Sequence, residues 1–294
     1  MTVRRPRFSG HQTFSFRYGW LEKGYQHVRD GRQFSDPDAL THLGVGKNMV
    51  DSIKYWCDAF GLVDDRTVTP FAESLLDPQT GWDPCLEDDA SLWLLHWRLC
   101  SQQHFMTAAT LLFGEMHKPE FDRYEWLDVL MQRDSQSQGK ATSVPTLERD
   151  MECCVKMYAP LKTAGKKRVL ELSYACPFQE LGLLSFLEGS SMLRFSIGPK
   201  SGLPPEIIGY AIWDYLRASE RSGLRLSELM YADYAPGQIF MLDENSLVEA
   251  VMQLHQSRRW GSYFNLTASE GIETVHCALP NGEDLLRAYY SDTE

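Results

Sequence analysis

The sequence predicts a mainly α-helical protein with small β-hairpins, in which tandem winged helix-turn-helix modules surround a central helical block. Three segments repeat the order short helix, tight turn, amphipathic helix and extended pair, which is the order of that module. The chain has 294 residues, long for a single hydrophobic core. Hydrophobic residues make up 43% and charged residues 23%, the balance of a globular protein.

We predict three regions along the chain. Residues 1–82 would hold a basic N-terminal segment and the first winged helix. Residues 83–200 would form the central helical block together with a second winged-helix-like module, and residues 201–294 a third module of this kind.

The first module has the clearest pattern. Asp36-Pro37 predicts the start of a helix that runs to about Leu43, and Gly44-Val45-Gly46 supplies the turn. From Lys47 onward the apolar residues fall on one helical stripe: Met49, Val50, Ile53, Cys57 and Phe60. Residues 62–63 and 66–69 then flank Asp64-Asp65 as two strands flank a hairpin turn.

The second helix of this module is the predicted DNA-reading element. It directs polar side chains away from the core stripe: Lys47, Asn48, Ser52, Lys54 and Tyr55. Lys and Asn near a helix N-terminus can reach phosphates and base edges in the major groove, and Arg66 lies where a wing would approach the backbone. Asp51 and Asp58 keep open the alternative that this winged helix contacts protein instead.

The later regions are predicted with less detail. Residues 91–113 form an apolar helical block, in which His96 and His104 are interpreted as structural. A helix from Pro145 places Arg149 on its outer face, and the following loop at residues 162–168 carries Lys166 and Lys167 as possible phosphate contacts. The third module has helices at 205–219, 226–230 and 243–256 and a hairpin around residues 269–271. We interpret it as structural or partner-binding, because its long helix carries Glu244 and Glu249.

The charge distribution is uneven. The net charge is −11, which argues against indiscriminate wrapping of DNA. Residues 1–66 nevertheless carry ten Lys/Arg and eight Asp/Glu, whereas the remainder carries 19 and 32. A locally basic N-terminus on an acidic body suits a focused nucleic-acid contact.

One N-terminal stretch combines basic, polar and aromatic residues densely. We expect its aromatic residues to anchor it to the core and its polar residues to act on DNA. The predicted phosphate contacts are Arg4, Arg5, Arg7, Thr13 and Arg17. His11 and Glu22 are the catalytic candidates, because a histidine can accept a proton near neutral pH.

The sequence contains none of the common catalytic or nucleotide-binding motifs. The sequence has no phosphate-binding P-loop, no H-E-x-x-H motif, no nucleophile elbow and no recognisable metal-dependent nuclease signature. Its seven cysteines lack the spacing of a disulfide framework or a paired metal site, and no apolar run is long enough to span a bilayer. We therefore expect a cytoplasmic protein without a nucleotide or organic cofactor.

The same N-terminal stretch carries a family resemblance. Phe8-Ser9-Gly10-His11-Gln12-Thr13-Phe14 and residues 17–24 resemble the opening of the Domain of Unknown Function 4007 family. The resemblance continues through residues 43–50 and 53–62, with fainter similarity at 145–150 and 178–183. It implies a role in bacterial DNA phosphorothioation and the antiphage defence built on it. The implied partners are a cysteine desulfurase, an ATPase and a sulfurtransferase, and the Ssp-type member is thought to nick one DNA strand.

From the residues and the resemblance together, we predict a component that binds double-stranded DNA and nicks it with the help of Mg²⁺ or Mn²⁺. The alternative is a recognition subunit or transcription regulator that binds DNA without cutting it. A third possibility is a scaffold whose winged helices hold proteins, which the acidic body favours.

Overall fold

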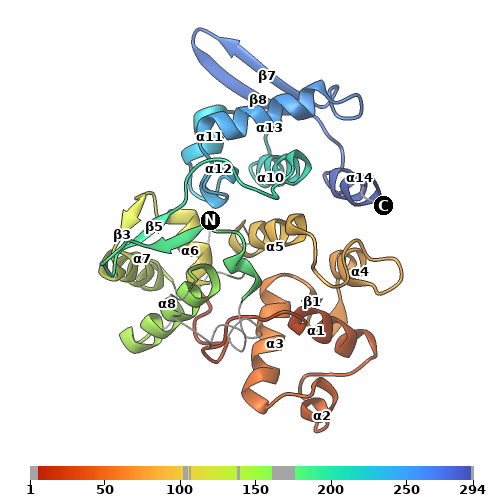
Figure 1. Ribbon diagram of the computed structural model, residues 1–294, viewed down its shortest axis with the longest axis vertical. Helices are drawn as coiled ribbons and strands as arrows, with labels where there is room; N and C mark the ends of the chain where they lie inside the picture. The colour runs from red at the N-terminus through yellow and green to blue at the C-terminus, as the bar shows by residue number, and fades with distance from the viewer. Residues whose placement is uncertain (1–5, 102–104, 106, 138–139, 161–175, 293–294) are drawn as a thin grey trace.

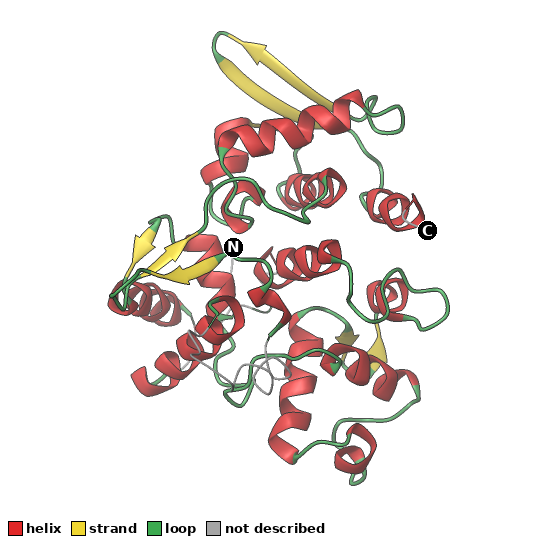
Figure 2. Ribbon diagram, viewed as in Figure 1, coloured by secondary structure: helices red, strands yellow, loops and turns green. Residues whose placement is uncertain are grey.

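The computed structural model describes residues 6–101, 105, 107–137, 140–160 and 176–292. The chain is mainly helical, as the sequence predicts, and it has three small antiparallel sheets (Figures 1 and 2). In the orientation of Figure 1 the N-terminal helices lie at the bottom, α5 crosses the middle and the C-terminal region lies at the top. Among the described residues, no helix is both long enough and apolar enough to cross a membrane.

The N-terminal region follows the predicted order of elements. It contains α1 (Trp20–Arg29), α2 (Ala39–Leu43), α3 (Lys47–Ala59), β1 (Val63–Asp64), β2 (Thr67–Val68) and α4 (Pro70–Leu76). The turn between α2 and α3 depends on Gly44, whose φ of 66° lies in the left-handed region that glycine tolerates. The predicted start of α2 was wrong: Asp36 instead caps the preceding turn, where its carboxylate accepts the Gln33 backbone N–H at 2.7 Å.

The predicted central helical block is two helices, α5 (Asp89–Ser101) and α6 (Ala108–Glu115). Thr107 starts α6 with a capping box. The Thr107 hydroxyl accepts the Thr110 backbone N–H, and the Thr110 hydroxyl accepts the Thr107 backbone N–H. His96 in α5 is fully buried and contacts the Tyr158 hydroxyl at 2.8 Å and the Ile239 carbonyl at 2.9 Å. Burial lowers the pKa of His96 to about 4, so this histidine is a neutral structural residue.

The rest of the central region packs two helices beside a short sheet. Its elements are β3 (Glu120–Phe121), α7 (Arg123–Gln136), α8 (Val144–Tyr158), the 3₁₀ helix η1 (Pro177–Gln179), β4 (Leu184–Phe186) and β5 (Leu193–Phe195). The strands run antiparallel in the order β3-β5-β4. The sheet was not predicted, since its strands are only two or three residues long and β3 is contributed from before α7.

The C-terminal region has the predicted long helix and hairpin. Its elements are α10 (Pro205–Ala218), β6 (Gly223–Arg225), α11 (Leu226–Tyr231), α12 (Pro236–Ile239), α13 (Glu244–Gln256), β7 (Phe264–Ser269), β8 (Ile272–Cys277) and α14 (Glu283–Asp292). Asp243 caps α13 by accepting the Ser246 N–H at 2.8 Å. The three strands form an antiparallel sheet in the order β6-β8-β7.

The three predicted regions share one hydrophobic core. A single cluster of buried side chains extends from Phe16 to Ala288 and includes the fully buried Trp56, Trp126 and Phe240. Polar bonds also cross between regions: the Trp97 indole donates to Asp214 at 3.0 Å and the Arg98 Nε donates to the Phe60 carbonyl at 3.0 Å. The regions are therefore packed together rather than joined by free linkers.

Candidate nucleic-acid interface

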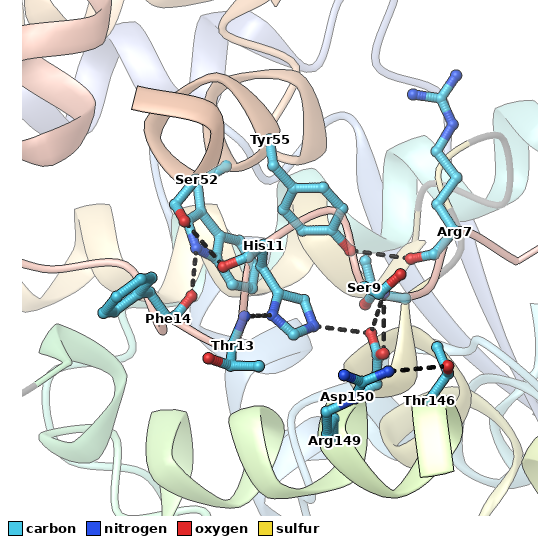
Figure 3. Close-up of polar contacts among 12 residues, drawn as sticks. Arg7, Ser9, His11, Thr13, Phe14, Ser52, Tyr55, Thr146, Arg149 and Asp150 are labelled. Carbon is cyan, nitrogen blue, oxygen red and sulfur yellow. Dashed lines mark hydrogen bonds and ion pairs between the residues drawn. The ribbon is translucent and has the colours of Figure 1, made fainter. Parts of the chain in front are cut away.

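The conspicuous N-terminal stretch forms a tight loop, residues 7–14, that is fastened to α8 (Figure 3). The Ser9 backbone N–H lies 2.9 and 2.8 Å from the two carboxylate oxygens of Asp150, and His11 Nε2 lies 2.7 Å from Oδ1. Ser9, Gln12 and Thr13 have φ values of 62°, 49° and 67°, a region that non-glycine residues rarely adopt. Such strain persists only where surrounding contacts impose it, as the Asp150 carboxylate does here.

His11 uses both of its ring nitrogens in this arrangement. The Thr13 backbone N–H donates to Nδ1 at 3.1 Å, so the ring proton lies on Nε2 and is donated to Asp150. The imidazole is also stacked on Trp56 and is only 3% exposed. For His11 to accept a proton from a substrate, these contacts would first have to break; as the structure stands, its role is to hold the loop in place.

Helix α3 fastens the other side of the loop. Ser52 Oγ donates to the His11 carbonyl at 2.8 Å, the Tyr55 hydroxyl to the Arg7 carbonyl at 3.0 Å, and the Trp56 indole to the Phe14 carbonyl at 3.0 Å (Figure 3). Ser52 and Tyr55 are buried, so these two predicted DNA contacts lie behind the loop rather than on a free surface. Their hydroxyl groups donate to carbonyl oxygens of the loop backbone.

Gly10 permits the close approach of the loop to α3. A Cβ atom added at this position would lie 2.3 Å from Cδ2 of Tyr55, well inside van der Waals contact. The loop and the aromatic face of α3 therefore fit together only with glycine here.

An open groove of about 500 Å³ lies beside the loop. It is lined by Pro6, Arg7, Phe8, Ser9, Gly10, Tyr55, Lys140, Ala141, Thr142 and Thr146. Arg7 and Lys140 on its wall are exposed, and so is Arg149, one turn of α8 beyond Thr146. Arg7 lies more than 100 residues from Lys140 and Arg149 in the chain, and the fold brings it to the groove that Lys140 lines and whose wall residue Thr146 is bonded to Arg149.

Local contacts hold two of these cations in place. The Arg7 guanidinium lies 4.6 Å from the centre of the Phe105 ring. Arg149 Nη2 donates to the Thr146 hydroxyl at 3.1 Å, and its Nε donates to the Pro145 carbonyl at 3.2 Å (Figure 3). Neither contact neutralises the charge, so both guanidiniums can still attract an anion.

A second hollow of about 580 Å³ lies on the other side of Arg7 and has mixed charge. Lys54, Asp58, Asp64, Asp65 and Arg98 line it together with Phe105 and neighbouring backbone. Lys54 forms an ion pair with Asp58 at 2.6 Å, which reduces its availability for phosphate. Burial raises the pKa of Asp58, while the ion pair with Lys54 opposes this shift.

The remaining predicted residues lie around this surface or apart from it. Lys47 and Asn48 are exposed on the first turn of α3, Arg66 is exposed in the β1–β2 turn, and Thr13 is exposed at the tip of the loop. The Arg17 guanidinium lies over the Trp20 ring at 5.2 Å, and Glu22 is exposed on α1. Arg4, Arg5, Lys166 and Lys167 lie outside the described residues, as does His104.

Sequence reasoning did not select Asp150, Lys140 or Thr142. Asp150 is the last residue of the Pro145–Asp150 segment, which carries part of the family resemblance. The resemblance covers this residue but does not indicate what its side chain does. Nothing in the local sequence indicates that a carboxylate on α8 will accept hydrogen bonds from residues 9 and 11. Lys140 and Thr142 follow a polar connection that resembles an ordinary solvated loop.

A divalent ion is not accommodated by the loop site as it stands. Both oxygens of Asp150 accept N–H groups, and the free nitrogen of His11 accepts another, so these ligand atoms are already occupied. Within the residues that the model describes, no group of three or more His, Cys, Asp or Glu side chains is arranged to hold a metal.

Comparison with known proteins identifies the family. The chain is 29% identical to a solved structure of SspB with a bound magnesium ion, with a TM-score of 0.86 over 98% of this chain and 89% of that one. It is 30% identical to another SspB crystal structure, with a TM-score of 0.85 over 98% of this chain and 90% of that one. No curated protein matches the chain. A family model described as a protein of unknown function (DUF4007) matches residues 8–290, and the chain therefore belongs to the DUF4007 family.

Proposed function

We propose that this protein is the SspB-like, DNA-binding component of a single-strand DNA phosphorothioation and defence system, in which it nicks one strand of the duplex. Family membership and the likeness to SspB over nearly the whole chain support the assignment to such a system. Its partners would be the cysteine desulfurase, ATPase and sulfurtransferase of that system.

The observation that carries DNA binding is the gathering of cations beside the loop. Arg7 and Lys140 line one groove and Arg149 donates to Thr146 on its wall, although the chain as a whole carries a net charge of −11. An acidic protein that concentrates exposed cations at a single hollow is suited to a local phosphate contact rather than to general adhesion to DNA. Thr146 adds a hydroxyl group that can donate to a phosphate oxygen, whereas the Thr142 hydroxyl already donates to Asp134 Oδ1 at 2.8 Å.

Winged-helix modules at the two ends of the chain are part of the proposal. This part of the proposal is supported by the N-terminal order α1-α2-α3-β1-β2 and by the C-terminal order α10-β6-α11-α12-α13-β7-β8, in which the short helix α12 is an addition to the usual module. In the N-terminal module, the loop covers Ser52 and Tyr55 on α3. DNA would therefore meet the first turn of α3, at Lys47 and Asn48, and the loop itself rather than the full length of the helix.

The competing function is DNA recognition without cleavage, as a specificity subunit or a transcription regulator. The His11 contacts favour this alternative, because Nδ1 accepts the Thr13 N–H and Nε2 donates to Asp150. A nicking enzyme would need another general base or a rearrangement of the loop. Glu22 stays a candidate, since its side chain is exposed on α1.

A plasmid assay distinguishes the two functions. Purified protein is incubated with supercoiled plasmid in Mg²⁺, in Mn²⁺ or in EDTA, and open-circle product is scored on a gel. Nicking that requires the metal and is lost in a Glu22→Gln variant would support the enzyme and give Glu22 a role. Supercoiled plasmid that is retarded but never opened under any of these conditions would establish recognition without cleavage. The Glu249→Gln variant is the matched control, because Glu249 is an exposed acidic residue on α13 in the C-terminal region.

A further inference from the structure

The C-terminal sheet has an open edge at β7. The sheet order β6-β8-β7 leaves β7 paired on one side only, and the β7–β8 hairpin extends beyond α13 at the top of Figure 1. The hairpin closes through Glu270 and Gly271, whose φ values of 52° and 78° are those of a two-residue turn that suits the twist of the strands.

The register shows which backbone groups point toward the open side. The Ala278 N–H donates to the Tyr263 carbonyl, and the Cys277 N–H donates to the Ser222 carbonyl. In an antiparallel ladder this alternation directs Asn265 and Thr267 toward β8, and Leu266 and Ala268 away from it. Among the described residues, the backbone N–H and C=O groups of Leu266 and Ala268 have no hydrogen-bond partner.

This edge lacks the features with which proteins normally prevent edge-to-edge pairing. β7 reads Phe-Asn-Leu-Thr-Ala-Ser, with no charge and no proline over six residues, and Thr267, Ala268 and Ser269 are exposed. The opposite edge strand, β6, is protected in the usual way, because it has only three residues and ends in Arg225. An uncharged open edge on so acidic a chain is therefore a specific feature of β7.

The edge is complementary to itself. A two-fold axis at Thr267 would place Leu266 of one copy opposite Ala268 of the other, so that both outward pairs of N–H and C=O groups are satisfied. The pairing would end at Phe264, whose carbonyl already accepts Nδ1–H of His255 at 2.8 Å. It would also bring the turn at Glu270 of one copy toward the loop before β7 of the other, which carries the exposed Arg258.

We infer that β7 is the dimerisation edge of this protein: two copies pair antiparallel through residues 266–268 into one six-stranded sheet. The charges are compatible with a second copy, because this pairing would bring Glu270 of one copy toward the segment that carries Arg258 of the other. The contact is small, so it belongs to the weak class of interfaces and forms in a concentration-dependent way.

Sedimentation velocity over about 1 to about 200 µM tests the inference, a range chosen to span weak association. The wild type should pass from the mass of one chain to that of two. Ala268→Pro should stay monomeric, because its missing N–H faces the partner and not β8. The matched control Ala268→Thr keeps that N–H and should still form dimers.

A second variant pair keeps the test decisive if proline disturbs the hairpin. Thr267→Lys places like charges directly opposite each other at the two-fold axis and should abolish the dimer, whereas Thr267→Val should retain it. A wild type that is monomeric over the whole range would overturn the inference. So would a dimer that survives in both Ala268→Pro and Thr267→Lys.

Discussion

His11 and Asp150 lie 139 residues apart in the sequence, yet Nε2 of one is 2.7 Å from Oδ1 of the other, with both side chains buried. This contact joins the N-terminal loop to α8 and fixes the ring orientation of His11. Asp150 also accepts the backbone N–H of Ser9, which lies on the wall of the groove that Arg7 and Lys140 line.

Asp150→Asn should destabilise the protein by about 2 kcal/mol. Two N–H groups, those of Ser9 and His11, contact the carboxylate oxygens, and asparagine would replace one of these acceptor oxygens with an NH₂ donor and remove the negative charge. Urea unfolding measures the loss in the free energy of unfolding. Glu152→Gln on the exposed face of the same helix should change it by less than about 0.5 kcal/mol. Equal effects in the two variants would show that the carboxylate does not fasten the loop.

Gly10→Ala should cost about 1–3 kcal/mol, because its Cβ would lie 2.3 Å from the Tyr55 ring. The same unfolding measurement applies. Gly46→Ser is the control: no atom lies within 4 Å of a Cβ there, and serine is a better helix N-cap than glycine in this position before α3. The steric account fails if Gly10→Ala is as stable as the wild type.

The Cys85 thiol should react much faster than the other six thiols. Cys85 is exposed, whereas the other six cysteines are buried and burial raises their pKa values. A chromogenic disulfide reagent should therefore label one thiol quickly in the native protein and all seven in denaturant. Cys85→Ser should remove the fast phase, and two or more fast thiols in the wild type would contradict the burial.

The six buried thiols should make the protein less stable at high pH. Their pKa values are higher in the folded state than in the unfolded chain, so the unfolded chain releases protons first as the pH rises. Their contribution to stability is complete below about pH 8.5, the ordinary thiol pKa, and is lost progressively above it. The urea midpoint should fall between pH 7.5 and pH 9.5, and a midpoint that rises over this interval would refute the prediction.

The sequence was sufficient for much of the secondary structure. Local patterns with a physical cause, such as the apolar stripe of α3 and the hairpin expected around residues 269–271, predicted elements that the structure contains. The sheet β3-β5-β4 was missed because its strands are too short to show an alternating pattern. The N-cap of α2 was misplaced because the Asp36 carboxylate serves the turn before it.

The candidate site was predictable only in part. Dense charge and aromatic residues marked the segment at residues 4–24, and the structure does bring Arg7 and Arg149 to one groove. The orientation of Ser52 and Tyr55 could not be predicted, because an outward position on α3 becomes a buried one once the loop covers it. The Asp150 contact is tertiary and leaves no local signal in either segment.

The central claim is that the groove beside the loop binds DNA, and the salt dependence of duplex affinity tests it most directly. Fluorescence anisotropy gives the affinity of a labelled duplex at several salt concentrations for the wild type, Arg7→Gln, Arg149→Gln and the control Arg221→Gln, whose side chain pairs with Glu228 in the C-terminal region. Each groove variant should weaken binding and reduce the slope of log K against log salt by about 0.9, the value for one lost phosphate contact. The control should match the wild type. Groove variants that bind with the wild-type affinity and slope would place the DNA contact elsewhere and contradict the account.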